Sequence, residues 1–434
     1  MKAFDQIVNE LYTTLATLPD KRTGANVQFP MQDIGLTAFA VFFMQSPSFL
    51  SAQESLQNKT GKNNLKTLFR VERIPSENHV RALLDPINPD VFHPVFDCVY
   101  EAFKKQGVLE QLQGVNGTQY IALDGTQIHS SNKIGCDNCL VKKHKNGTVS
   151  YHHNAITPVI VSPTRKLAIP LRIEFLTPQD GHDKQDSEIA AAKRWIDAHG
   201  EFYNTGNTTL LGDDLYAHQP FCRRVLLNNY HFIFVCKPLS HTHLYGWIDL
   251  LDPDEDIRTQ TQRIKNAKGK WETHTLRYVN DVPLKEGEDS LRVNWIEHIV
   301  VQGKKQTYKN AFVTDHQITE KNAMGLAEGG RSRWKIENEN NNTLKTKGYH
   351  LEHNFGHGKE NLCSVLTSLN ILAFLMHTFL DFNDQAYRRI RLELRSRKKF
   401  FEHVRVLTSY HAYSDWEELM RFMMRGLEIA YNSS

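Results

Sequence analysis

The spacing of apolar residues changes its character twice along the chain. Up to about residue 110 it follows the helical period, as in IGLTAFAVFFM, and Ser- or Pro-rich breaks such as SPSFLSAQES precede the next helical stretch. From about residue 115 the pattern turns to short β-rich runs, and after about residue 359 it is again helical and basic. We therefore expect a helical N-terminal DNA-binding or assembly domain (1–112), an α/β domain (113–358) and a helical C-terminal region (359–434).

The runs within 113–358 predict a definite order of elements. Three apolar runs, residues 119–128, 148–163 and 166–176, predict consecutive strands, and DSEIAAAKRWIDAHG predicts a helix that stops at a Gly. NTTLLGDDLYA and HFIFVCKPL predict two further strands around a helix in HQPFCRRVLLNN. A polar, strand-rich insertion follows at about 240–315. The order β-β-β-α-β-α-β predicts the α/β layers of a ribonuclease H-like core.

Composition limits the class of protein that this chain can be, but it does not identify the function. With 434 residues, 40% of them hydrophobic and 23% charged, the chain has the composition of a globular protein with a large core. The formal charge of +3 is too small for a general nucleic-acid binder, so any DNA contact must come from local basic patches. The N-terminus lacks the pattern of a secretory signal, which favours a cytosolic protein. The apolar stretch 363–380 contains Asn370 and His377, which favours a buried core helix over a membrane span.

Three carboxylates stand where a metal site would need them. Asp124 closes the apolar run YIALD before Gly-Thr, Asp213 closes TTLLGD, and Glu337 lies in a later helical segment. Converging acids repel one another unless cations lie between them, and two Mg²⁺ or Mn²⁺ ions suit such oxygen ligands. Taken alone, Asp124 could be a hairpin residue, because Asp-Gly is a favoured turn. Asp214 competes with Asp213, which is preferred because it follows the strand directly.

The three motifs together resemble those of a known family. DGT at Asp124, GDDLY at Asp213 and RWKIE at 333–337 are similar to motifs of the DDE transposases of bacterial insertion sequences, in the cut-and-paste branch with a β-strand insertion before the catalytic Glu. That branch carries a signature of Tyr, two residues, Arg, three residues, Glu, six residues and Lys. Gly330 stands at the Tyr position, and Lys345 lies one position beyond that of the Lys. The resemblance covers roughly residues 115–380.

The resemblance implies a DNA transposase that binds the terminal inverted repeats of its own element, cuts at the ends and joins the 3′ hydroxyls to target DNA. It implies that the three acids hold the catalytic metal and that Arg333, Lys345 and Tyr216 contact DNA. It also implies a homodimer or larger assembly on DNA in the cytoplasm of a bacterial or archaeal cell, with no membrane partner. Two alternatives stay open: a ribonuclease H-like nuclease or resolvase without strand transfer, and a domesticated, zinc-stabilised DNA-binding protein without catalysis.

A second group of residues suggests a different metal. The run CDNCLVKKHKNGTVSYHHN places a CxxC pair, Cys136 and Cys139, ahead of His152 and His153, which makes a zinc site possible. The alternative is a pair of buried thiols, which are common in cytosolic proteins. In YHLEHNFGHG the histidines at 350, 353 and 357 are interrupted by Gly, which favours a DNA-facing or structural role over a metal site.

The run YRRIRLELRSRKKF concentrates positive charge near the C-terminus. Such a run is usually a solvated helix face, yet its scarcity of acids favours contact with phosphate. We expect DNA contacts from Arg388, Arg389, Arg395 and Lys398.

Overall fold

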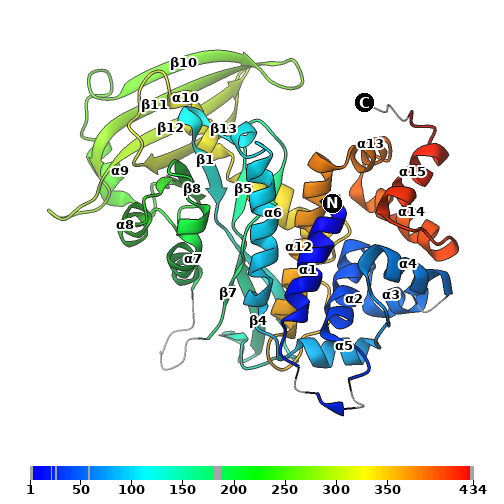
Figure 1. The fold of residues 1–434 in the computed structure, drawn as a ribbon. Coiled ribbons are helices and arrows are strands. Elements are labelled where there is room, and N and C mark those ends of the chain that lie inside the picture. The colour runs from blue at the N-terminus through cyan, green and yellow to red at the C-terminus, as the bar shows by residue number, and fades with distance from the viewer. Residues whose placement is uncertain (1–2, 21, 25–26, 57–58, 179–186, 431–434) are drawn as a thin grey trace.

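The computed structural model describes residues 3–20, 22–24, 27–56, 59–178 and 187–430. It is a mixed α/β protein with a long sheet on one side and a helical body on the other (Figure 1). The helices that precede the first strand are α1 (Ala3–Ala16), α2 (Met31–Phe43), α3 (Phe49–Leu56), α4 (Lys59–Phe69), α5 (Glu77–Leu84) and α6 (His93–Lys105). The short 3₁₀ turns there are η2 (Pro89–Phe92), η3 (Glu110–Leu112) and η4 (Val115–Gly117).

The main sheet has nine strands in the order β10-β11-β12-β13-β9-β8-β1-β5-β6. Its strands are β1 (Gln119–Ala122), β5 (Val159–Val161), β6 (Ala168–Pro170), β8 (Thr208–Gly212), β9 (His231–Val235), β10 (Arg258–Lys265), β11 (Trp271–Pro283), β12 (Arg292–Gln302) and β13 (Lys305–Thr314). β8 is parallel to both β1 and β9, and all other pairs are antiparallel. The predicted insertion is therefore strand-rich, and it extends the same sheet because β13 pairs with β9.

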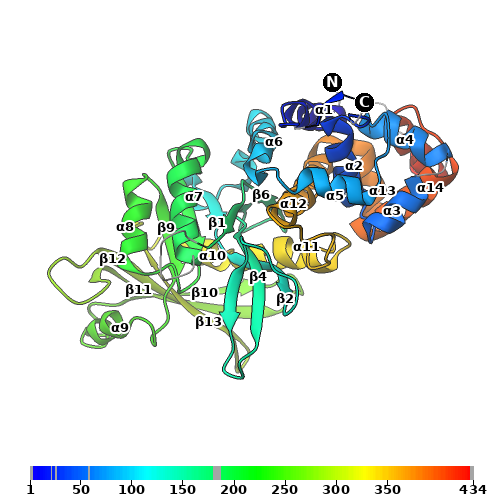
Figure 2. The same ribbon diagram turned by 90° about the horizontal axis from the view of Figure 1, so that it is seen from below.

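Each of the three predicted long strands is divided in two. Residues 119–128 form β1 and then β2 (Gly125–Ser131), which belong to different sheets and are separated at Leu123 and Asp124. The second sheet has four strands and also contains β3 (Leu140–Lys143), β4 (Val149–Ile156) and β7 (Glu174–Leu176). The segment from β2 to β4 (residues 125–156), which includes β3 and is called the hairpin below, projects from the middle of the molecule (Figure 2).

Alternation along β1 divides its side chains between two layers. Ile121 packs in one hydrophobic core with α7 (Glu188–Tyr203) and α8 (Gln219–Leu227), and Ala122 packs in another with α10 (Ala323–Arg331). Successive side chains of a strand point to opposite faces of a sheet, so helices cover both faces around β1, β8 and β9. The helix predicted at 186–200 is α7, which begins at Glu188 after the N-cap Ser187. Residue 186 lies outside the described residues. The insertion also contains α9 (Thr242–Ile248).

The helical body is built around one buried helix, α12 (Leu362–Asn383). This helix is long and apolar enough to cross a membrane, but all of its apolar window is buried in the protein, which confirms the prediction of a core helix. The last helices, α13 (Gln385–Glu393), α14 (Arg397–Tyr410) and α15 (Trp416–Gly426), pack in the same core as α1 and α2. For example, the Phe4 and Trp416 rings stack at 4.7 Å. Helices from the two ends of the sequence thus share one core.

Asp85, just after α5, caps the start of α12. Its carboxylate accepts hydrogen bonds of 2.9–3.2 Å from the backbone N–H groups of residues 359, 360, 361 and 362. The first N–H groups of a helix have no partner within it, and Asp85 satisfies that of Leu362 together with three N–H groups of the segment that leads into the helix. Gly358 has φ of +72°, and a Cβ there would collide with the Asp85 carboxylate. Both residues are therefore required for this contact between distant segments.

We expect Asp85→Ala to lower the free energy of unfolding by about 2–3 kcal/mol, because it leaves several N–H groups without an acceptor. Asp85→Asn keeps one acceptor oxygen and should lose less. Denaturant unfolding measures the effect, with Glu101→Ala as control, since Glu101 is exposed and only pairs with Lys104 at 3.6 Å. Equal losses in Asp85→Ala and Glu101→Ala would contradict this account.

Candidate functional site

The pairing of β1 with β8 brings two of the predicted acids to the same edge of the sheet. The parallel register places Ala122 opposite Leu211, so Asp124 and Asp213, each two residues further on, leave the sheet side by side. The ladder continues between them, because the Leu123 N–H donates to the Leu211 carbonyl at 2.8 Å. Neighbouring strands lie about 4.8 Å apart, so the two carboxylates start from adjacent backbone positions.

Asp214 is committed elsewhere. Its carboxylate accepts from the backbone N–H of Lys237 at 2.6 Å and from the Ser240 hydroxyl, and it lies 3.5 Å from His241 Nε2. It therefore holds the loop after β9. Asp213 accepts only a local hydrogen bond, from the Leu215 N–H at 2.8 Å, among the interactions of the described residues. This difference favours Asp213 as the residue available to a ligand.

Glu337 arrives from a distorted helical turn. The chain leaves α10 at Arg331 and passes into the π-helical turn η5 (Ile336–Asn341), followed by α11 (Asn342–Thr346). Arg333 donates to Glu337 Oε1 at 2.7 Å, and Glu337 is otherwise exposed. Such π turns occur frequently at functional sites. From the same turn, the Asn341 side-chain amide donates to Asp124 Oδ2 at 3.3 Å, a contact that the sequence analysis did not anticipate.

Lys335 anchors this turn from beneath. Its buried ammonium donates to the backbone carbonyls of Ser162, Pro163 and Arg165, the last two at 3.0 and 2.8 Å. Burial lowers the pKa of Lys335 to about 8. The three carbonyls fix the segment that carries Glu337 against the turn between β5 and β6.

A fourth carboxylate, Glu188, was missed from the sequence. It opens α7, and its Oε2 lies so close to the backbone beside Asp124 that a Cβ at Gly125 would be 2.5 Å away. Tyr216 donates its hydroxyl to Glu188 Oε1 at 2.7 Å. Tyr216 is fully buried, so the predicted contact with DNA is wrong: its hydroxyl instead orients Glu188. An acid in the first turn of a helix is too common for the sequence alone to single out Glu188.

The electrostatics of the site follow from crowded carboxylates. Burial raises the pKa of Asp124 to about 7, the Arg333 guanidinium opposes that rise, and Glu188, Glu337 and Asp213 add to it. Three acids and one arginine thus lie close enough to act on Asp124. An arrangement of this kind favours cations, because each cation relieves repulsion that the protein alone leaves.

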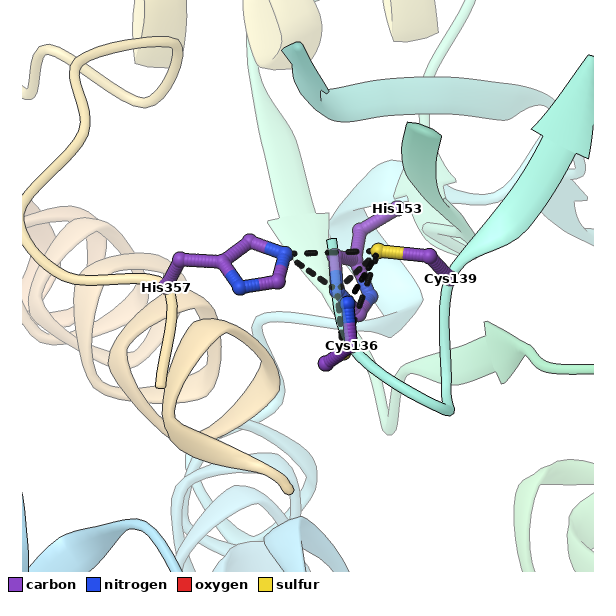
Figure 3. A group of neighbouring side chains, drawn as sticks. All are labelled: Cys136, Cys139, His153 and His357. Atoms are coloured by element: carbon purple, nitrogen blue, oxygen red, sulfur yellow. Dashed lines mark hydrogen bonds between the residues drawn. The ribbon is translucent and has the colours of Figure 1, made fainter. Parts of the chain in front are cut away.

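The second candidate site is a cluster of two cysteines and two histidines (Figure 3). Cys136 and Cys139 have their Sγ atoms 3.8 Å apart, and His153 Nε2 lies 3.4 and 3.3 Å from these sulfurs. His357 Nε2 lies 3.3 Å from Cys139 Sγ and 3.2 Å from His153 Nε2. The four donor atoms all lie within 4.8 Å of one another, so this group could hold a metal ion.

Two sequence expectations change at this cluster. His152 is not a member, because adjacent strand residues point to opposite faces and its ring contacts Ser150 and Gln127 instead. His357 is a member, although the glycines around it favoured another role. Gly356 and Gly358, with φ of +149° and +72°, let the loop bend so that the ring reaches the hairpin. No local pattern could reveal this, since His357 lies 218 residues from Cys139.

The basic residues divide into exposed and committed ones. A cleft of about 1210 Å³ between the helical body and η5–α11 is lined by Arg388, Arg395 and Lys398, as well as by Arg165 and Lys166. Several other basic side chains already have partners: Arg389 donates to the Ala430 carbonyl, Lys345 pairs with Glu352 at 2.9 Å, and both Arg391 and Arg397 pair with Asp381.

A further group, His231, Asp315 and His316, also has its ligand atoms within 4.8 Å. Its contacts form an ordinary hydrogen-bonded network. His231 Nδ1 lies 2.6 Å from Asp315 Oδ2, the two imidazoles stack at 4.4 Å, and His316 Nε2 contacts Thr209 Oγ1 at 2.8 Å. His231 pairs with Thr209 near the start of β8, so this group lies at the edge of the sheet away from Asp213.

Comparisons with known proteins name no relative: no family model matches the chain, and none of the curated proteins matches it. The site therefore has to be interpreted from its own geometry.

In metal-free protein, Asp124 should reduce stability as the pH rises. Between the usual value of 3.8 and about 7 the folded state binds more protons at this group than the unfolded state, so the free energy of unfolding falls across that window. We expect Asp124→Asn to be more stable than wild type at pH 8 by up to about 4 kcal/mol, and equally stable at pH 4, in urea unfolding with EDTA. The exposed Asp249→Asn serves as control. A stability difference between Asp124→Asn and wild type that does not change with pH would exclude the raised pKa of Asp124 as its cause.

Proposed function

We propose that this protein is a DNA transposase of the DDE type, in which Asp124, Asp213 and Glu337 hold two Mg²⁺ or Mn²⁺ ions for DNA cleavage and strand transfer. The observation that carries the proposal is the meeting of Asp124 and Asp213 at one sheet edge, where the charges of both Asp213 and Glu337 act on Asp124. When bound at such a site, hard divalent ions activate water and stabilise the leaving oxygen of a phosphodiester.

The topology supports a ribonuclease H-like core as part of this proposal. In the five strands β6-β5-β1-β8-β9, the first three are antiparallel and the last three are parallel. The helices α7 and α8 connect the parallel strands, in the order that the sequence predicted for such a core. Ligands of open α/β sheets bind beyond the carboxyl ends of parallel strands, where Asp124 and Asp213 stand.

The chain's own residues have separate tasks in this proposal. Asn341 donates to Asp124 and orients it, and Tyr216 does the same for Glu188. Arg333 holds Glu337 and keeps a guanidinium beside the acids, where a DNA phosphate would approach. The basic cleft, with Arg388, Arg395 and Lys398, supplies phosphate contacts outside the carboxylates.

The substrate is double-stranded DNA in this proposal, namely the terminal inverted repeats of an insertion sequence and its target. The assembly of two or more copies and the cytoplasmic location are proposed with it, and these features rest on the motif resemblance. A nuclease without strand transfer has the same carboxylate geometry. Incubating the protein with pre-cut ends and a target plasmid separates the two, because only a transposase joins the 3′ ends to the target.

We also propose that the ion at the Cys/His cluster is zinc. With Zn–S of about 2.3 Å and Zn–N of about 2.0–2.1 Å, a tetrahedral site has edges of about 3.8 Å between sulfurs, 3.6 Å between S and N and 3.3 Å between nitrogens. The cluster has 3.8 Å between sulfurs, 3.3–3.4 Å for three of its four S–N pairs, and 3.2 Å between nitrogens. His357 Nδ1 also contacts the Gly358 carbonyl at 3.0 Å, which fixes its ring in the way metal-bound histidines require.

Neutralising any one proposed metal ligand should abolish cleavage. We expect Asp124→Asn, Asp213→Asn and Glu337→Gln to cut DNA at least about 10³-fold more slowly, since metal ions at such sites contribute several kcal/mol. Binding of end DNA in gel shifts should be retained, because basic residues carry it. The matched control is Asp214→Asn, which should cut at close to the wild-type rate. A cutting Asp213→Asn with an inactive Asp214→Asn would reverse the assignment.

Zinc should be present in purified protein at about one ion per chain by elemental analysis, because the four donors complete its usual coordination. Cys136→Ser should lose the ion and lower the melting temperature. The neighbouring His152→Ala should keep it. Metal-free wild-type protein of unchanged stability would disprove the zinc assignment.

A further inference from the structure

The Cys/His cluster joins the two segments that carry the active-site carboxylates. Three of its ligands lie on the β2–β4 hairpin, whose base holds Asp124, and the fourth, His357, follows the segment that holds Glu337. We propose that zinc at this cluster acts as a fastener for the active site: the pairing of β1 with β8 sets Asp124 beside Asp213, and the zinc-loaded cluster holds the segment with Glu337 firmly against Asp124. This inference rests on the proposed function.

The hairpin links the cluster to Asp124 through paired strands, with a bulge between Gln127 and His129. β2 begins at Gly125, and its ladder with β4 pairs Gly125 with Ile156 and His129 with His153. At the base, the Thr157 N–H donates to the Asp124 carbonyl at 3.2 Å. His153 lies on β4 and Thr157 follows the end of that strand, four residues further on, which is about 14 Å at 3.4 Å per residue. A shift of His153 is therefore passed along a hydrogen-bonded ladder to Asp124.

The other branch runs from η5 to His357. Asn341 touches both sides of the hairpin base, because its side-chain N–H donates to Asp124 Oδ2 at 3.3 Å and its Oδ1 accepts from Thr157 Oγ1 at 3.3 Å. Between α11 and α12 the chain has neither helix nor strand for residues 347–361. A connection without helix or strand can position η5 only through its contacts with the rest of the protein. His357 provides one of its contacts with the hairpin.

The ends of the two branches meet on the start of α12. The Asn138 amide, between the two cysteines, donates to the Glu360 carbonyl at 2.9 Å, and the Cys363 N–H donates to the His357 carbonyl at 3.3 Å. The hairpin runs from Asp124 to the cluster, and a second segment runs from Glu337 through Asn341 to His357. The two segments thus contact each other at two places, at Asp124 and at the metal cluster. Without the metal, the hairpin tip is held chiefly by exposed hydrogen bonds, which contribute little to stability.

The test compares three substitutions in the otherwise full-length protein. His357→Ala removes one ligand, His357→Cys replaces it with another zinc ligand, and His353→Ala removes an exposed histidine outside the cluster. Each variant is measured for zinc content, for backbone hydrogen exchange of residues 336–346 without DNA, and for Mg²⁺-dependent cleavage of end DNA. Wild-type protein stripped by a zinc-selective chelator provides the same comparison without a mutation.

We expect His357→Ala and the stripped wild type to lose zinc, to exchange residues 336–346 about tenfold faster or more, and to lose cleavage. His357→Cys should restore all three properties, and His353→Ala should match wild type. Loss of zinc with unchanged exchange of residues 336–346 overturns the inference, whatever the cleavage result. If wild-type protein cuts no DNA, the proposed function fails, while the exchange measurement still decides whether zinc fastens the two segments.

Discussion

The parallel pairing of β1 with β8 is the constraint on which the rest of the structure depends. Two strands that run in the same direction end at the same edge, and the register of Ala122 with Leu211 sets Asp124 beside Asp213. An antiparallel pair would have sent the two acids to opposite edges. The crossover through α7 that parallel pairing requires also brings Glu188 to this edge, because that helix begins there.

The crowded carboxylates are held in place by neighbouring side chains. Arg333 is the charged partner, while Tyr216 and Asn341 each hold one carboxylate by a neutral hydrogen bond. Neutral donors orient an acid without cancelling its charge. Burial raises the pKa of Asp124 to about 7, and the charges of Glu188, Glu337 and Asp213 add to that rise. This negative charge is what a pair of divalent cations would relieve.

The helical body contributes by fixing where the chain returns after Glu337. Asp85 accepts from several N–H groups at the start of α12, and the buried α12 cannot shift without disturbing the core it shares with α1 and α2. His357 lies immediately before this capped start. Its ring is thus delivered to the hairpin from a fixed point, which suits a residue that joins two distant segments.

The sequence by itself determined the elements and the local placement of the first three acids. Period-two and period-3.6 patterns gave the order of strands and helices, and Asp124 and Asp213 stood out because each ends an apolar run. The sequence could not show that 119–128 divides between two sheets, since that division depends on β1 pairing with β5 and β8 while β2 pairs with β4. Nor could it single out Glu188, assign His357 to the metal cluster, or exclude Tyr216 from the surface. Those outcomes depend on contacts between residues far apart in the chain, such as Cys139 with His357, and only tertiary packing decides which distant side chains meet.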